Sequence, residues 1–359
     1  MSLSARVAAS NESDTLLAWR DVQAQLADHP AKALIVFCSA DHNLPTLGNA
    51  LAQSANCPVL ACTSAETTPV LRVMSLADAD LNLHLFAFPA VSTGQVNAEA
   101  IIEAIADAAQ TSPLGHQTLG LLLVDGLSHA EEWLAHALYT RLPNVAFLGG
   151  SAGDSFRFER TWVYWDGVFR SDVAVFGLFD LGTPFHLFQS ELCADAGEPL
   201  VITLADVQRR AVLQINGLPA AEVYAAALGL REDQLSPAIW RKHPLMLKVG
   251  ADQVARAISH VASDGALVCL SAVDTGLIAT VGTASNTHAE LVEQYSRARQ
   301  TMGKVAGLLL IDCALNDHPD SLDTTDPNVP TLVLRSYGEQ FNGQHLNASV
   351  AGLALGAGK

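Results

Sequence analysis

AEAIIEAIADAAQTSPLGHQTLGLLLVDGLSHAEEWLAHALYTR, residues 98–141, is the stretch that decides the fold class. Residues 98–109 and 130–141 are predicted as helices, and the apolar run 119–124 between them has the length of a buried strand. Strands that alternate with helices favour parallel pairing, because parallel strands need a crossover connection that is usually a helix. This stretch therefore predicts a mixed α/β protein.

The same alternation continues toward the amino terminus, whereas hairpin patterns replace it farther along the chain. There, Asp166-Gly167 and Asn216-Gly217 are good turn signals, and Pro219 is suited to open a helix. The pattern changes near residues 190–215, which indicates two sheet-containing domains with mixed strands flanked by helices. Further helices are predicted at 13–26 (capped by Ser13 or Asp14), 44–55 and 288–302; further strands at 33–39, 58–63, 72–88 (as a hairpin), 245–249, 257–261, 267–272, 277–281, 306–313, 331–335 and 348–353; and a polar loop at 316–328.

Length and charge narrow the class of protein. The 359 residues exceed the roughly 100–200 of one domain, and half of them are apolar, which is enough for a large buried core. The 37 acidic residues outnumber the 20 basic ones, and the net charge of −17 repels nucleic-acid phosphate and anionic lipid. Arg209-Arg210 and Arg241-Lys242 are the modest basic candidates. We therefore expect neither a nucleic-acid nor a membrane partner.

Targeting patterns and cysteine spacing point to the cytoplasm. The amino terminus, MSLSARVAASNESD, lacks the apolar core of a signal peptide, and apolar runs such as 305–311 are far shorter than the ~18 residues that span a bilayer. The six cysteines form no CxxC pair, so there is neither zinc-ribbon spacing nor a CxxCH site for covalent haem. Most of them lie in apolar runs, where a reduced thiol acts as a small hydrophobe.

Three segments stand out from the generic core: DGLS at 125–128 with Glu131-Glu132 after it, FLGGSAGD at 147–154, and SYGEQF at 336–341 with Asn347 after it. Three more, INGLPA at 215–220, HPL at 243–245 and LIDCA at 310–314, follow the same order as in a known family. Together the six segments resemble the paired FIST N and FIST C domains, from about residue 32 to residue 352. The resemblance implies an N-terminal helical extension at 1–31, a FIST N-type domain at 32–200 and a FIST C-type domain at 201–355.

The resemblance also implies a function, that of a bacterial sensory module for small ligands, which is not an enzyme. Its partner would be a histidine kinase or a cyclic-dinucleotide enzyme, and a homodimer is left open. A stand-alone FIST chain resembles the NosP type, whose members bind haem b without covalent attachment and sense nitric oxide. Two departures from the usual pattern, at residues 63–68 and at Asn316, leave the ligand class open.

His243 is the residue we select as the haem-iron ligand. Trp240 and apolar neighbours would form a wall, Arg241 and Lys242 would pair with the propionates, and Pro244 restricts the backbone of His243. A histidine before proline also occurs as a purely structural residue, so both interpretations stand. Tyr337 and His345 are the lesser cofactor candidates.

Two alternatives use other residues. In a sensor of another small ligand, such as an amino acid, Glu66, Asp154 and Glu339 would hold the amine, and the backbone at Gly150 and Ser151 would approach the ligand. The same residues also fit a tight turn and helix caps. Residues 149–153 formally match the G-x-S-x-G elbow of an acyl hydrolase, with Ser151 as nucleophile, but a β-hairpin is predicted after it where the elbow needs a helix.

Overall fold

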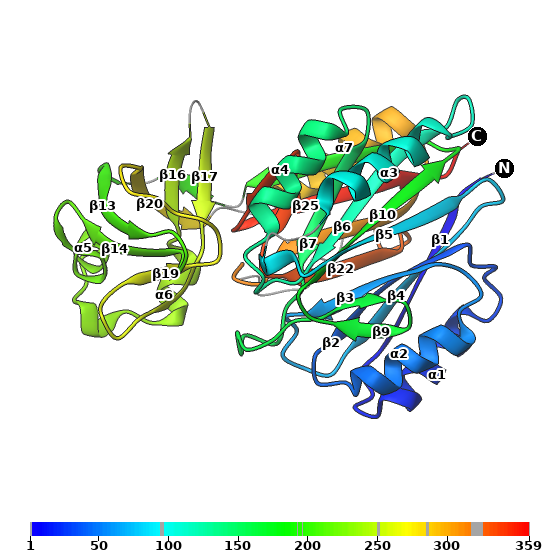
Figure 1. Ribbon diagram of the computed structural model, residues 1–359, viewed down its shortest axis with the longest axis horizontal. Helices are drawn as coiled ribbons and strands as arrows, with labels where there is room; N and C mark the ends of the chain where they lie inside the picture. Colours follow the sequence, from blue (N-terminus) through cyan, green and yellow to red (C-terminus); the bar gives the residue numbers. More distant parts are fainter. Residues whose placement is uncertain are drawn as a thin grey trace.

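Two bodies of unequal size lie side by side in the computed structural model (Figure 1), which describes residues 2–93, 97–191, 193–195, 197–249, 252–284, 287–316 and 326–358. The large body comprises the described parts of 4–191 and 287–356, and the small body, 193–284, is inserted between them in the sequence. The predicted mixed α/β class is confirmed. None of the described helices is long and apolar enough to cross a membrane.

The large body repeats one arrangement of strands three times. In each unit, an outer strand is followed by two parallel strands, and a last strand runs antiparallel between the outer strand and the first parallel strand. The first unit contains β1 (Ser4–Ser10), α1 (Thr15–Leu26), β2 (Ala33–Ser39), α2 (Leu44–Ser54), β3 (Val59–Ser64) and β4 (Leu71–Ala77); the second contains β5 (Asn82–Pro89), α3 (Ala98–Gln110), β6 (Gln117–Val124), α4 (Glu131–Arg141), β7 (Ala146–Ser151) and β10 (Val173–Leu181); the third contains β11 (Phe185–Glu191), α7 (Thr287–Met302), β21 (Val305–Cys313), β22 (Thr331–Ser336) and β25 (Ser349–Gly356).

Connections between the units close them into a ring. The hairpin β8 (Val163–Trp165) and β9 (Val168–Arg170) leaves the second unit and pairs with β3 of the first. In the same way, β23 (Glu339–Phe341) and β24 (Gln344–Leu346) leave the third unit, and β23 pairs with β7 of the second. The first unit reaches the third through Ala65, whose backbone N–H donates to the carbonyl of Arg335 at 2.8 Å.

One apolar core lies between the three sheets. Each unit contributes buried strand residues to it, for example Ile35 from β2, Leu121 from β6 and Ile311 from β21. Helices cover the outer faces, and their starts follow local rules: the Asp14 side chain accepts the N–H groups of Leu16 and Leu17 at the start of α1. Burial of apolar area at about 25 cal/mol per Å² is what favours this layered packing.

The small body is a separate nine-stranded antiparallel sheet with its own core. Two short helices and a 3₁₀ turn (Glu232–Gln234) cover it, and Tyr224 and Trp240 on these helices are buried against the strands. Its elements are β12 (Cys193–Asp195), β13 (Leu200–Asp206), β14 (Ala211–Ile215), β15 (Leu218–Pro219), α5 (Ala220–Ala227), α6 (Pro237–Lys242), β16 (Leu245–Val249), β17 (Asp252–Arg256), β18 (Ile258–Val261), β19 (Leu267–Cys269) and β20 (Ile278–Ala284).

Most local predictions are confirmed. The strand 33–39 has the predicted bounds, the turns at Asp166-Gly167 and Asn216-Gly217 join paired strands, and α5 begins directly after Pro219. All six cysteines are free, and burial raises the pKa of the Cys38 thiol to about 12. Most of the predicted loop 316–328 lies outside the described residues.

Three long-range predictions differ from the structure. Residues 72–88 do not form a hairpin, because β4 pairs with β1 and β2 whereas β5 pairs with β10. Residues 1–31 are more than a helical extension, because β1 pairs with β4 along its whole length. The two bodies are also not divided at residue 200: β21, β22 and β25 share a core with residues of the first 181, so the segment after 304 belongs to the large body.

Candidate functional site

Three serines occupy equivalent positions where the carboxyl ends of the parallel strand pairs meet. Ser64 ends β3, Ser151 ends β7 and Ser336 ends β22, and all three are buried. A ring of backbone hydrogen bonds joins the strand ends: Ala65 N–H to Arg335 O, Gly153 N–H to Thr63 O at 3.0 Å, and Tyr337 N–H to Ser151 O at 3.1 Å. In α/β proteins, ligands bind outside the carboxyl ends of the strands, so a binding site is expected at this end of the large body.

An acidic residue follows each serine, and these are the three carboxylates predicted to hold an amine. Glu66 forms an ion pair with Arg72 through Oε1. Glu339 is fully buried, where it accepts hydrogen bonds from Ser336 Oγ at 2.9 Å and Ser349 Oγ at 2.7 Å. Burial raises the pKa of Glu339 to about 8. Of the two, only Glu66 lies at a partly exposed position.

Asp154, the third carboxylate, organises a strained loop. It accepts the backbone N–H groups of residues 158, 159 and 160 at 2.8–2.9 Å and the hydroxyl of Tyr337. The Tyr337 oxygen in turn accepts the N–H of Phe156 at 2.8 Å. Ser155, Phe156 and Phe158 have φ angles of 60°, 61° and 52°, which cost energy in residues other than glycine. The oxygens of Asp154 are therefore used to hold the loop.

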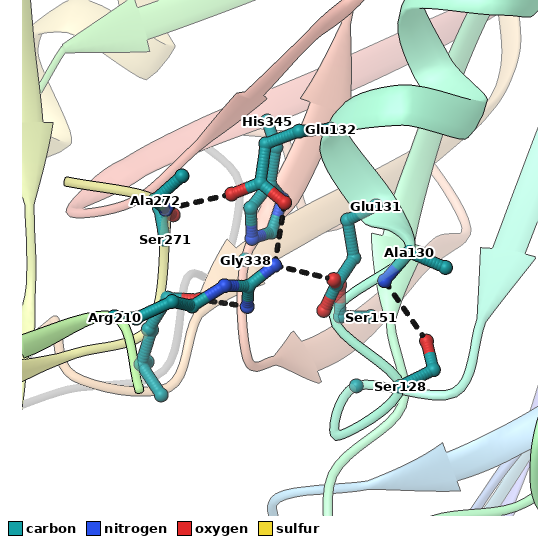
Figure 2. Close-up of polar contacts among 12 residues, drawn as sticks. Ser128, Ala130, Glu131, Glu132, Ser151, Arg210, Ser271, Ala272, Gly338 and His345 are labelled. Carbon is teal, nitrogen blue, oxygen red and sulfur yellow. Dashed lines mark hydrogen bonds and ion pairs between the residues drawn. The ribbon is translucent and has the colours of Figure 1, made fainter. Parts of the chain in front are cut away.

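The small body meets this end of the large body through a buried ion cluster around Arg210, which Figure 2 shows. Arg210 Nη2 lies 2.8 Å from Glu131 Oε2 and 2.5 Å from Glu132 Oε2, at the start of α4, while its Nη1 donates to Leu270 O at 2.5 Å. Glu132 Oε1 accepts the N–H of Ala272 at 2.7 Å. Arg210 is 4% exposed and Glu131 is 1% exposed, so their salt bridge is desolvated. We call the contact region between the two bodies, which contains this salt bridge, the seam.

The charges in this cluster control the protonation of Glu132. Burial alone would raise its pKa, but the Arg210 guanidinium and the Ala272 N–H lower it below the ordinary value. For Arg210, burial lowers the pKa, whereas Glu131 and Glu132 outweigh burial and raise it. The ionised forms of both partners are therefore favoured.

His345 and Gln340 lie beside the cluster on the β23–β24 hairpin. The Gln340 amide nitrogen is 3.0 Å from Ser151 Oγ and 3.0 Å from His345 Nδ1. The buried Nε2 of His345 and the buried Oε1 of Gln340 both lack a hydrogen-bond partner among the described residues. The ring edge lies against Gly338, where an added Cβ would come within 2.2 Å of it.

Ser151 lies at a buried strand end and not in a nucleophile elbow. Its Oγ accepts from the Gln340 amide, and the chain continues from β7 into a loop and the β8–β9 hairpin, as the sequence predicted, with no helix after the turn. Gly150 pairs with Glu339 across the sheet, and an added Cβ there would meet Ile311 and Leu334 at 2.7 Å. Both residues thus serve packing of the strand ends.

The four residues predicted around a haem lie on or after α6 of the small body. Trp240 is buried in the small-body core, and Lys242 is exposed. The Arg241 guanidinium lies 4.6 Å from the ring centroid of Phe156 in the large body. His243 is half-buried, and its Nδ1 lies 3.0 Å from the carbonyl oxygen of Gly282. His243 is therefore bonded within the small body, whereas Arg241 and Tyr337 both contact Phe156.

Sequence reasoning missed Arg210 as a site residue. It considered Arg209-Arg210 only as a surface basic pair, because the carboxylates that bury Arg210 lie 78 and 79 positions earlier. The one local signal was the doublet Glu131-Glu132 after DGLS.

Comparisons with known proteins agree with the six-segment resemblance. The FIST N domain family matches residues 32–218, and the FIST C domain family matches residues 220–342. No curated protein matches the chain significantly. Two solved structures of cyanuric acid hydrolases, one from A. caulinodans, align with 99% of this chain and 99% and 100% of theirs, both at 10% identity, with TM-scores of 0.37 and 0.33. TM-scores this low carry neither fold nor reaction over to this chain.

Proposed function

Because the chain belongs to the FIST family, with a FIST N and a FIST C domain in sequence, we propose that it is a sensor whose small ligand binds at the seam between the two bodies. The supporting observation is the buried Nε2 of His345, which has no partner among the described residues and lies beside the Arg210–Glu132 pair. A buried polar atom without a hydrogen-bond partner costs about 1–3 kcal/mol, so a ligand that bonds to it gains that energy on binding.

Binding there changes the seam, and with it the placement of the small body. Among the described residues, the two ion pairs of Arg210 with Glu131 and Glu132 join the small body to α4, so a ligand that competes for Arg210 loosens this connection. The output partner we propose is a histidine kinase or a cyclic-dinucleotide enzyme, which would respond to this change.

A thermal-shift screen tests the seam as the ligand site. A ligand at 100 times its Kd stabilises the folded state by about 2.7 kcal/mol. We expect His345→Gln to reduce the shift, whereas His260→Gln, at an exposed position of the small body, leaves it unchanged. Equal shifts in both variants would place the ligand elsewhere.

For the ligand we propose haem b first, with nitric oxide as the sensed gas. The Nδ1 of His243 faces the carbonyl of Gly282 at 3.0 Å, and a proton held on Nδ1 leaves Nε2 as a lone-pair donor suited to bind iron. Haem iron would supply the gas-binding position. Of the predicted propionate partners, Arg241 has a guanidinium at the seam, and Lys242 is exposed.

Haem titration tests this candidate. The purified protein should develop a Soret band that shifts with nitric oxide, and His243→Ala should weaken it strongly while His260→Ala does not. If the band forms equally in His243→Ala, another residue is the axial ligand. If no Soret band forms in the unmodified chain, haem is excluded as the ligand.

An amino acid is the second candidate, and it is favoured by one contact. Glu66 bonds Arg72 through Oε1 at a partly exposed position, which leaves its second oxygen for an amine, whereas the oxygens of Asp154 and Glu339 are used internally. The thermal-shift screen with the standard amino acids separates this candidate from haem.

A further inference from the structure

The seam contains a cluster of aromatic side chains from the large body, and an arginine of the small body lies over one of their rings. Phe156, Phe158 and Tyr337 form one cluster, in which the rings of Phe158 and Tyr337 stack at 4.8 Å between centroids. Both phenylalanines remain partly exposed. Arg241 of α6 places its guanidinium 4.6 Å from the centroid of Phe156. The covering group is therefore a planar cation on an aromatic face.

The loop that carries the two phenylalanines is held rigidly. Its left-handed residues are costly, yet Asp154 and Tyr337 fix them through the N–H groups of residues 156 and 158–160. Backbone strain that the surroundings maintain is characteristic of ligand clamps. Both phenylalanines pack against a small buried apolar cluster that includes Tyr337, yet each remains partly exposed.

Positive charge gathers at the same place in a chain of net charge −17. Burial lowers the pKa of Arg335; the carboxylates of Glu66 and Glu339 raise it, and the charges of Arg241 and Arg72 lower it, so the three cations lie close to one another with these two acidic side chains among them. Arg335 is paired with Asp312 and Arg72 with Glu66. Arg241 has no carboxylate partner within the described ranges, and its Nε is buried without an acceptor.

We propose that Arg241, Phe156 and Phe158 form a subsite for a planar conjugated carboxylate. The ligand's ring stacks on an exposed face of the phenylalanine pair, and its carboxylate accepts N–H groups from the planar fork of Arg241. This subsite deepens the proposed function and rests on it, because it names the chemical class that a ligand at the seam presents.

Isothermal titration of the full chain with benzoate tests the subsite. Cyclohexanecarboxylate is the matched probe, with the same charge and a similar size but no planar ring, and inorganic phosphate tests for an anion site alone. We expect benzoate to bind at least tenfold more tightly than either. Arg241→Gln should weaken benzoate binding at least tenfold, and Phe156→Leu should remove the preference over cyclohexanecarboxylate.

Arg231→Gln is the control variant, because Arg231 is an exposed arginine of the same body, paired with Asp233. It should bind benzoate as the unmodified chain does. Circular dichroism establishes that Arg241→Gln is folded, and Arg241→Lys, which keeps the charge but not the planar fork, should recover only part of the affinity.

The outcomes separate this subsite from the sensor function itself. No benzoate binding, equal affinity in Arg241→Gln, or a preference for phosphate overturns the subsite. If an aliphatic amino acid binds in a way that His345→Gln weakens, while benzoate does not bind, the proposed sensor function is supported and the subsite is refuted. If no ligand binds in either experiment, both fall.

Discussion

Replacing Arg210 by Met should open the seam between the two bodies. The guanidinium makes three side-chain contacts there, with Glu131, Glu132 and the carbonyl of Leu270, and it is almost fully buried. Removing one partner of a buried ion pair leaves the other charge desolvated, which costs about 3–5 kcal/mol. We expect a loss of that size in the free energy of unfolding, measured in urea at neutral pH.

The pH dependence gives this prediction a specific signature. A carboxylate whose folded pKa is lowered, as for Glu132, adds stability above its unfolded pKa, and this stability is lost as the pH falls through the folded pKa. Arg210 is one of the groups that lower the pKa of Glu132, so Arg210→Met loses much of the stability that ionised Glu132 contributes. The difference in unfolding free energy between the unmodified chain and Arg210→Met should therefore stay constant near neutral pH and narrow as the pH falls below about 4.5, the ordinary pKa of Glu.

Arg209→Met is the matched control. Arg209 precedes Arg210 directly, but it is about half exposed and pairs with the exposed Asp264. Its loss should be much smaller, because solvent screens such pairs. A double variant, Arg210→Met with Glu132→Gln, should lose less than the sum of the single changes. Equal losses for both arginines, or a gap that does not depend on pH, would refute the desolvated seam.

Three further predictions concern the buried groups near the strand ends. Because the folded pKa of Glu339 is raised to about 8, the folded state binds more protons than the unfolded one between about pH 4.5 and 8, so stability falls with rising pH by up to about 1.4 kcal/mol per unit; Glu339→Gln should flatten this slope in urea titrations at several pH values. Gly338→Ala should cost about 2 kcal/mol or more, since φ is 151° and the new methyl meets the His345 ring, and a thermal melt that matches the unmodified chain would contradict the geometry. Ser151→Ala should hydrolyse p-nitrophenyl acetate no more slowly than the unmodified chain, and a loss of turnover would revive the hydrolase hypothesis.

Local structure was largely predictable from the sequence because its causes are local. The run ALIVFCS is apolar up to its final serine and forms β2 with the predicted bounds, and Asp14 caps α1 as its side chain predicts. Pairing was not predictable in the same way. Residues 72–88 alternate as a hairpin would, yet their two strands enter different sheets, because β10, more than 80 residues later, pairs with β5.

The candidate site shows the same limit. Asp154, Tyr337 and His345 were identified from motifs, and the structure brings them near one seam. Their individual roles depend on neighbours that the motifs do not specify. Asp154 would hold an amine if its oxygens were free, but three backbone N–H groups and a tyrosine hydroxyl use them. Arg210 was missed because burial by distant carboxylates leaves no local pattern.

The threefold repetition of the large body explains where function is located. Ser64, Ser151 and Ser336 are equivalent, and a ring of backbone hydrogen bonds joins their strand ends. The repetition is broken in the third unit, where the small body is inserted between β11 and α7. That insertion brings Arg210 and Arg241 to the strand ends of the large body. Polar groups without partners, the Nε2 of His345 and the Nε of Arg241, occur along this asymmetric seam, and it is there that a ligand gains most by binding.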